Sequence, residues 1–251
     1  MLYRGGMVKI DHKLLLLFII VVLLGSIIVN QQYAQDNEQT MQIKVPQNLE
    51  HKILGSDSKG TVTKTGPYGN PYSTQKIAII VGVHPLEANS HKAIVESVLI
   101  NSKSLNSSYY IYSIDVTKDP ENYDNGRING QLLANRYAVP DIKKNKFQLV
   151  VDVHSNRGKA TGYKEIRFLS VPLKSNRSKL IASKIITEIP WLVYYIPPNE
   201  KGPKSPKYVT VPLIASGIPS IVYESYTYDP YKITLEHADE FVKTIDNLKL
   251  N

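Results

Sequence analysis

The feature that most constrains the fold of this chain is a set of three apolar runs that each end in reactive polar residues. The runs are IAIIVGVHPLE at residues 77–87, FQLVVDVHS at residues 147–155 and PSIVYES at residues 219–225. Short apolar runs bounded by turn residues predict strands that are buried on both faces, as in the parallel sheets of α/β proteins. Open sheets of this kind bind their ligands at the carboxyl ends of the strands. The three runs therefore predict a functional site at one edge of a central sheet.

The rest of the chain alternates between helical and strand-like patterns. Apolar residues that recur on one helical face predict helices at residues 88–100, 179–189 and 233–248, and a short helix or loop at residues 127–137. Strands are predicted at residues 76–83, 109–116, 147–153, 166–171, 192–196 and 220–224, and residues 209–215 fit a short helix or a strand. Because strands alternate with helices, we expect an α/β fold with a mixed, largely parallel sheet and helices on both faces.

The N-terminal residues have the pattern of a membrane segment. Residues 14–29, LLLLFIIVVLLGSIIV, are uncharged and follow Arg4, Lys9 and Lys13. As a helix this segment spans about 24 Å, slightly less than the ~30 Å hydrocarbon core of a bilayer. It is slightly long for the apolar core of a signal peptide, and no small-residue cleavage site is evident. We expect an uncleaved single-pass anchor, with a cleaved signal and secretion as the alternative.

The charge around this segment predicts the topology. Positive residues precede it, which places residues 1–13 in the cytoplasm and the remainder of the chain outside the cytoplasm. Residues 30–73 are polar and rich in turn residues, so we interpret them as a stalk or linker with a short strand around residues 41–45. Residues 74–251 then form the α/β domain.

Composition limits the chemistry that the chain can perform. The 251 residues contain no cysteine, so any metal ion must be held by His, Asp or Glu. The formal net charge is +8, but the basic residues are scattered and do not alternate with aromatic residues, so we expect no nucleic-acid partner. The charge favours an acidic substrate or an anionic surface, and a solvated basic face is the alternative.

Two strand ends carry residue types that bind zinc. His84 and Glu87 follow the first run in a turn that contains Pro85, and His154 ends the second run. Three ligands of these types, with a fourth position left for water, are typical of catalytic zinc sites. Asp152 lies two residues before His154 on the same strand face, so we expect it to orient that imidazole. A hydrogen-bonded core histidine is the alternative for His154.

The third run ends in Glu224, which has no basic neighbour in the sequence. A carboxylate beside a metal ion can accept a proton from the attacking water and pass it to the leaving amine. Arg127, Asn135 and Arg136 lie between the first two histidine-containing runs. Guanidinium groups can hold a substrate carboxylate or stabilise an oxyanion, although two arginines on a polar loop are also an ordinary surface feature.

Together, HPLE, the strand end DVHS, the Asn-Arg pair between them and a strand-end glutamate about seventy residues later resemble the zinc carboxypeptidase superfamily. The short spacings are more similar to its succinylglutamate desuccinylase and aspartoacylase branch. The resemblance covers residues 76–248. It implies one zinc ion held by His84, Glu87 and His154, with Glu224 as general base and acid, Arg127 polarising the scissile carbonyl, and Asn135 and Arg136 binding the carboxylate of the substrate.

The sequence departs from the family pattern at two places. The usual Gly-Asn between the first two ligands is replaced by Pro85 and Leu86, which keeps both ligands. The Asp-Leu before the Asn-Arg pair is replaced by Leu133 and Ala134, which weakens the assignment of carboxylate specificity. The tyrosine that caps the substrate in this family has no assignable equivalent among the seventeen tyrosines of the chain.

We therefore expect a membrane-anchored, extracytoplasmic zinc hydrolase that cleaves an amide bond next to a free carboxylate. Its substrate would be a peptide C-terminus or, for a deacylase, an N-acyl amino acid. The alternative from another class is a surface binding or adhesion module that keeps the scaffold without turnover. Stoichiometric zinc that is lost on mutating His84 would favour the enzyme, and activity on dipeptides compared with N-acetyl amino acids would distinguish peptidase from deacylase.

Overall fold

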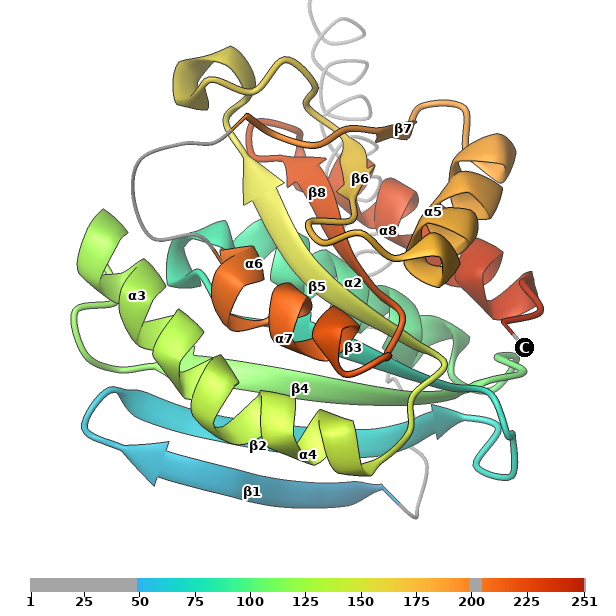
Figure 1. The fold of residues 1–251 in the computed structure, drawn as a ribbon, viewed down its shortest axis with the longest axis horizontal. Helices are drawn as coiled ribbons and strands as arrows, with labels where there is room; N and C mark the ends of the chain where they lie inside the picture. Colours follow the sequence, from blue (N-terminus) through green and yellow to red (C-terminus); the bar gives the residue numbers. More distant parts are fainter. Residues whose placement is uncertain (1–48, 199–204, 251) are drawn as a thin grey trace, which may run out of the picture. The chain divides into compact units, whose positions relative to one another are not determined.

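The predicted alternation of strands and helices folds into a mixed sheet with helices on both faces (Figure 1). The computed structural model describes residues 49–198 and 205–250. The strands are β1 (Glu50–Asp57), β2 (Gly60–Gly69), β3 (Lys76–Val81), β4 (Ser108–Val116), β5 (Leu149–Asn156), β6 (Phe168–Ser170), β7 (Val193–Tyr194) and β8 (Ser220–Tyr226). The helices are α2 (Ala88–Asn101), α3 (Tyr123–Leu133), α4 (Val139–Lys144), α5 (Asn176–Glu188), α6 (Ser205–Tyr208), α7 (Thr210–Ala215) and α8 (Tyr231–Asn247). Short 3₁₀ turns occupy Pro85–Glu87 and Gly158–Thr161, and a π turn occupies Ala134–Ala138.

The eight strands of the described residues follow the order β1-β2-β4-β3-β5-β8-β6-β7. The central pairs β4–β3, β3–β5 and β5–β8 are parallel, and so is β6–β7 at one edge. The pairs β1–β2, β2–β4 and β6–β8 are antiparallel. The three apolar runs identified in the sequence thus form the adjacent central strands β3, β5 and β8, and their carboxyl ends lie side by side.

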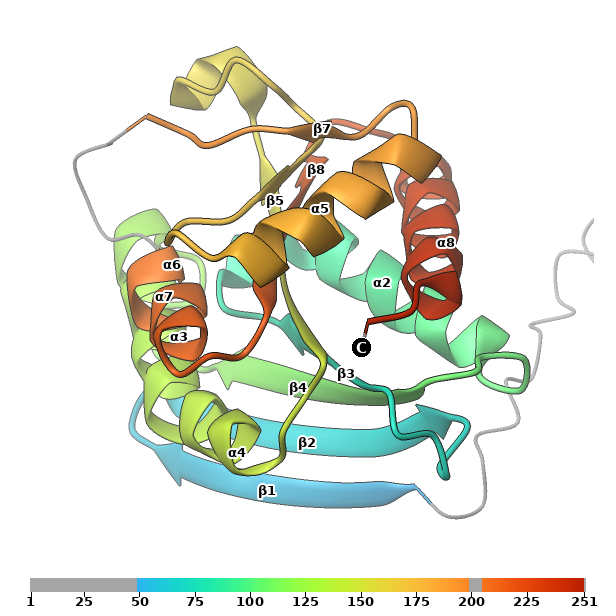
Figure 2. The same cartoon turned by 45° about the vertical axis from the view of Figure 1, so that its right-hand side comes forward.

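Each central strand contributes to two hydrophobic cores, one on each face of the sheet. Ile79 of β3 packs into the core that α2, α5 and α8 cover, whereas the next residue, Ile80, packs into the core beneath α3, α4 and α7. Figure 2 shows these two groups of helices on opposite sides of the sheet. Successive side chains of a strand point to opposite faces, so the part of a strand that is covered on both sides is apolar, as β3 is from Ile77 to Val81. The prediction of a mixed, largely parallel sheet with helices on both faces is confirmed.

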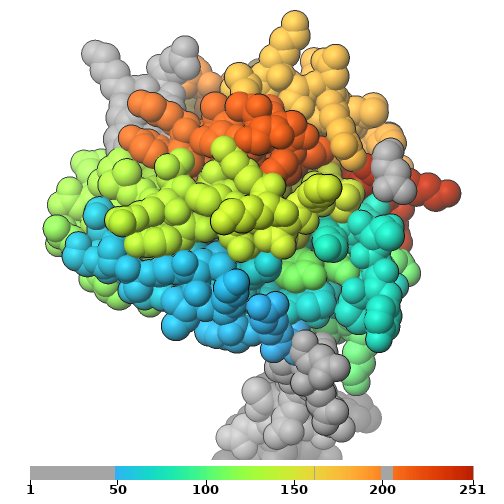
Figure 3. All heavy atoms as spheres, turned by 60° about the horizontal axis from the view of Figure 1, so that its bottom comes forward, coloured from blue at the N-terminus to red at the C-terminus, as the bar shows by residue number. Residues whose placement is uncertain are grey.

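The structure differs from the prediction of a polar linker at Glu50–Gly69, where β2 pairs antiparallel with β4 and β1 pairs antiparallel with β2. Figure 3 shows these two strands, in blue, forming an exposed band beside the yellow-green α3 and α4. Val62 and Tyr68 of β2 are buried, but β1 is largely exposed. An edge hairpin with one covered face needs few apolar residues, because backbone hydrogen bonds to β4 hold it in place. The predicted short strand at residues 41–45 lies outside the described residues.

The membrane segment predicted from the sequence, residues 14–29, also lies outside the described residues, as does the predicted cytoplasmic stretch 1–13. Within the part of the chain that the structure describes, none of the helices combines the length and the apolar character that a membrane span requires.

Candidate metal centre

The first predicted ligand pair sits where the chain leaves β3. Gly82 has φ +84°, and a Cβ atom there would lie 2.1 Å from the carbonyl oxygen of Ile114, so a larger residue would not fit this turn. The chain then enters a 3₁₀ turn that starts at Pro85, in which the N–H of Glu87 donates to the carbonyl of His84. The turn brings His84 Nδ1 to 2.9 Å from Glu87 Oε1. Two residues of one short turn therefore point at one place.

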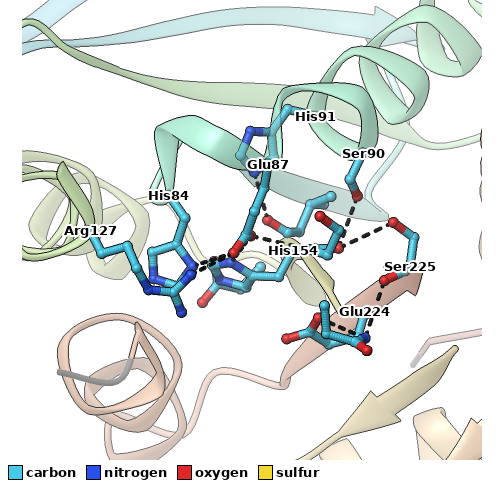
Figure 4. A network of polar contacts seen from close by, with 12 residues as sticks. His84, Glu87, Ser90, His91, Arg127, His154, Glu224 and Ser225 are labelled. Carbon is cyan, nitrogen blue, oxygen red and sulfur yellow. Dashed lines mark hydrogen bonds and ion pairs between the residues drawn. The ribbon is translucent and has the colours of Figure 1, made fainter. Parts of the chain in front are cut away.

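The third predicted ligand comes from the neighbouring strand. β5 runs parallel to β3, with Asp152 opposite Ile80, and this register places His154 beyond the end of β3. His154 Nδ1 lies 2.9 Å from Glu87 Oε2, and the backbone N–H of Ser155 donates to the same oxygen at 3.1 Å. Figure 4 shows Glu87 between the two imidazoles, and their ring centroids are 4.4 Å apart.

These three side chains fit a divalent metal ion. One ligand atom from each of His84, Glu87 and His154 lies within 4.8 Å of the others, and all three residues are buried. The Nδ1 atoms of both histidines face the carboxylate, which leaves the Nε2 atoms for outer partners. His154 Nε2 lies 3.0 Å from Asp152 Oδ1, and Thr210 Oγ1 donates to the other oxygen of Asp152 at 3.2 Å. Asp152 thus lies where the sequence predicted it would orient His154.

The outer partner of His84 is Gln131 of α3, which the sequence analysis missed. Gln131 is fully buried, and its Nε2 lies 3.1 Å from His84 Nε2. Its Oε1 is buried without a hydrogen-bond partner among the described residues. A half-turn of the amide exchanges these two atoms, so that Oε1 accepts a hydrogen bond from His84 Nε2–H. That tautomer leaves the lone pair of Nδ1 directed at Glu87 and free for an ion.

Burial and mutual charge set the protonation of the three ligands. Burial is the largest influence on His84 and lowers its pKa to about 4, which keeps the ring neutral. Burial opposes the ionisation of Glu87, but its contacts with the imidazoles of His84 and His154 outweigh it and hold the pKa of this carboxyl well below its usual range. Burial likewise opposes a charged His154, but Asp152 and Glu87 raise the pKa of His154 well above its ordinary value. Glu87 is therefore a carboxylate at neutral pH, as a ligand must be.

Glu224 lies on β8, the strand next to the one that carries His154. β5 and β8 are parallel, and their register places Glu224 opposite His154. Its Oε2 accepts a hydrogen bond of 3.3 Å from Asn156 Nδ2. Burial is the largest influence on this carboxyl and raises its pKa to about 8. A carboxyl with a pKa near neutrality can both take up and release a proton, which is the property that general acid–base catalysis needs.

Arg127 reaches the same place from α3. Its Nη1 donates to Glu87 Oε1 at 2.8 Å, and its guanidinium carbon lies 4.9 Å from the centre of the Tyr123 ring. The helix can approach β3 this closely because residue 130 is glycine: a Cβ there would lie 2.1 Å from the carbonyl oxygen of Val83. One cavity is lined, among others, by His84, Glu87, Tyr123, Arg127, Arg157 and Glu224.

Asn135 and Arg136, the predicted carboxylate-binding pair, are not brought to this cavity. Asn135 Nδ2 donates to the backbone carbonyl of Tyr208 at 2.6 Å, and Arg136 pairs with Asp57 of β1 at 3.3 Å with its side chain 65% exposed. The reason is that the chain is helical from Tyr123 onward, not a loop. Asn135 lies eight residues after Arg127 and hence roughly 12 Å further along the helix.

His91 lies behind the site and has a structural role. It is buried, and its Nε2–H donates to the carbonyl oxygen of Val153 at 3.1 Å. Figure 4 shows it on α2, above His84 and His154 in that view. His91 therefore joins α2 to β5 and is not one of the three converging side chains.

The fold was compared with known proteins. No protein-family model matches the sequence, and no curated protein matches it. Among solved structures, a metallo-carboxypeptidase from Pseudomonas aeruginosa, in complex with (2-guanidinoethylmercapto)succinic acid, is 10% identical with a TM-score of 0.55, covering 86% of this chain and 68% of that one. A metallo-carboxypeptidase from Burkholderia cenocepacia is 11% identical with a TM-score of 0.53, covering 81% and 66%. A tripeptide-bound cell shape determinant protein from Helicobacter pylori is 10% identical with a TM-score of 0.50, covering 80% and 58%.

The fold of this chain is therefore that of the metallo-carboxypeptidases, as the resemblance in the sequence implied. The chain spans about two thirds of the length of the two carboxypeptidases and 58% of the cell shape determinant protein. The closer similarity to the desuccinylase and aspartoacylase branch stays a prediction.

Proposed function

We propose that the sheet domain, which begins with β1 at Glu50, is a zinc-dependent hydrolase of amide bonds. The observation that carries the proposal is the convergence of His84, Glu87 and His154, from two separate strand ends, on one buried point beside Glu224. The metallo-carboxypeptidase fold supports it. Two imidazoles and a carboxylate, with no cysteine in the chain, suit zinc in a catalytic rather than a structural site.

When bound, a zinc ion would polarise the scissile carbonyl and lower the pKa of a water molecule. Glu224 accepts the proton of the attacking water and delivers it to the nitrogen of the leaving amine. Arg127 faces the same cavity and donates hydrogen bonds to the oxygen on which negative charge develops. Asp152 and Gln131 hold the two imidazoles in the orientation that leaves both Nδ1 atoms directed at Glu87.

Location and substrate class complete the proposal. The apolar residues 14–29 anchor the chain in a membrane, and the charge before them leaves the hydrolase domain outside the cytoplasm. The substrate is a peptide with a free C-terminus. A tripeptide bound to the Helicobacter pylori protein of similar fold supports a peptide ligand.

Metal analysis and one variant test this function. We expect the full chain to bind one equivalent of zinc and to hydrolyse dipeptides, N-acetyl amino acids or both. Glu224→Gln removes the proton acceptor but none of the three ligands, so turnover should fall by about 10²-fold or more while zinc content stays the same. Unchanged turnover in the purified variant would exclude the role of Glu224. A wild-type chain without bound zinc would favour a binding module on this scaffold.

A further inference from the structure

The cavity beside the metal ligands has a cationic wall. Arg127 and Arg157 both lie close to the ring of Tyr123, at 4.9 Å and 5.6 Å between the guanidinium carbon and the ring centre. Tyr123 is the first residue of α3, whereas Arg157 follows the end of β5, three residues after His154. Two guanidinium groups that share one aromatic ring repel each other, and a bound anion relieves this repulsion.

The two arginines differ in their partners. Arg127 is already paired with Glu87. Arg157 makes no ion pair with any residue that the structure describes, and its side chain is exposed at the rim of the cavity. Its guanidinium therefore keeps its hydrogen-bond donors for a ligand.

The backbone on either side of Arg157 is held firmly by Asn156. The buried amide of Asn156 donates to the carbonyl oxygens of Ile166 and Ser225, both at 3.1 Å, and accepts from the N–H of Gly158 at 2.9 Å. The same Nδ2 contacts Glu224 at 3.3 Å. Asn156 thus ties the position of Arg157 to the residue proposed to transfer the proton.

The charges around the cavity favour an anion. Glu87 and Glu224 are its acidic lining residues; Glu87 accepts a hydrogen bond from Arg127, and Glu224 accepts one from Asn156. Both acidic residues of the lining thus have partners other than Arg157.

We propose that Arg157, stacked near Tyr123, binds the free carboxylate of the substrate, the role that the sequence assigned to Asn135 and Arg136. Planar guanidinium groups bind carboxylates through two parallel hydrogen bonds. The inference rests on the proposed hydrolase function, because it assumes that the cavity receives a substrate. It follows that the specificity for a free carboxylate comes from the loop after β5, and not from the helical pair that packs against β1 and Tyr208.

Binding of a matched pair of probes tests this subsite. The probes are N-benzoylglycine and its uncharged amide, titrated calorimetrically into the full chain loaded with zinc. We expect the wild type to prefer the carboxylate and Arg157→Ala to weaken its binding about 10- to 100-fold, since hydrogen bonds to charged groups are of that strength. Binding of the amide probe should not change, and Arg157→Lys should recover part of the loss.

Arg136→Ala is the matched control, because it also removes one guanidinium, but one that pairs with Asp57 of β1 and does not line the cavity. It should bind both probes as the wild type does. Equal binding of the carboxylate by the wild type and Arg157→Ala, or a loss confined to Arg136→Ala, would overturn the inference, as would a wild type that binds neither probe. Carboxylate binding that depends on Arg157 in a protein without hydrolytic activity would refute the proposed function and leave the subsite in place.

Discussion

Replacing Gln131 by methionine tests the metal centre at a residue that touches no ion. Methionine has a similar length and fills the same buried space on α3, but it cannot accept a hydrogen bond from His84 Nε2. The imidazole would then bind an ion through Nδ1 with a buried N–H left without an acceptor. The expected result is weaker zinc binding in a folded protein.

The size of the effect follows from the burial of both groups. Gln131 is 0% exposed and His84 is 3% exposed, so water cannot replace the lost acceptor. An unsatisfied buried donor costs about 1–3 kcal/mol, which corresponds to roughly a 5- to 150-fold change in an equilibrium constant. Outer partners of metal-binding histidines are typically worth about 10–100-fold in affinity. We therefore expect the dissociation constant for zinc to rise about 10- to 100-fold.

The assay is a competition for zinc between the full chain and a fluorescent chelator of known affinity. Gln131→Glu keeps an acceptor and should bind zinc at least as tightly as the wild type. Asn135→Leu removes an amide one turn further along the helical run, where it contacts Tyr208, and should leave zinc affinity unchanged. Wild-type affinity in Gln131→Met, or an equal loss in Asn135→Leu, would refute the proposed role of Gln131.

Three further predictions concern stability and packing. Burial lowers the pKa of His91 from 6.5 to about 4. The unfolded chain therefore takes up a proton first as the pH falls, and the free energy of unfolding should decrease between pH 6.5 and 4 by up to about 3 kcal/mol for this group. In urea titrations at several pH values, the free energy of unfolding should change less steeply with pH for His91→Gln than for the wild type. An equally steep change with pH in both proteins would contradict this. Gly130→Ala places a Cβ 2.1 Å from the carbonyl oxygen of Val83, so it should push α3 away from β3. The variant should therefore bind zinc more weakly in the chelator assay. Unaltered zinc affinity would show that the close approach of α3 is unimportant for the metal centre. Zinc at a thousandfold excess over its dissociation constant should add about 4 kcal/mol to the free energy of unfolding. His84→Ala should abolish this gain, and a wild type that gains nothing argues against a folded metal site.

The central strands and the metal ligands could be predicted from the sequence for one physical reason. Strands buried on both faces are apolar along most of their length, so the central parts of β3, β5 and β8 are visible as short apolar runs. A polar residue directly after such a run lies at the carboxyl edge of the sheet. His84, His154 and Glu224 could therefore be placed near one another without any knowledge of the intervening chain.

The remaining parts depend on information that residue types do not carry. Strand β1 is held by backbone hydrogen bonds to β2, and these leave no pattern of apolar side chains. Which residues of the helical segment face the cavity depends on where α3 begins. With its start at Tyr123, residues 127 and 131 face the metal centre, whereas residue 136 faces β1. The four-residue spacing of Arg127 and Gln131 was the available signal, but it is informative only once that segment is known to be helical.

The register that sets Glu224 opposite His154 joins two distant parts of the chain. Two of the proposed ligands belong to the turn between β3 and α2 and the third to β5, whereas the proposed proton carrier belongs to β8, a strand from much later in the chain. Under the proposed function, a chain with β8 displaced would keep the three ligands but lose the group that carries the proton. Metal binding and turnover would then respond separately to changes in β8.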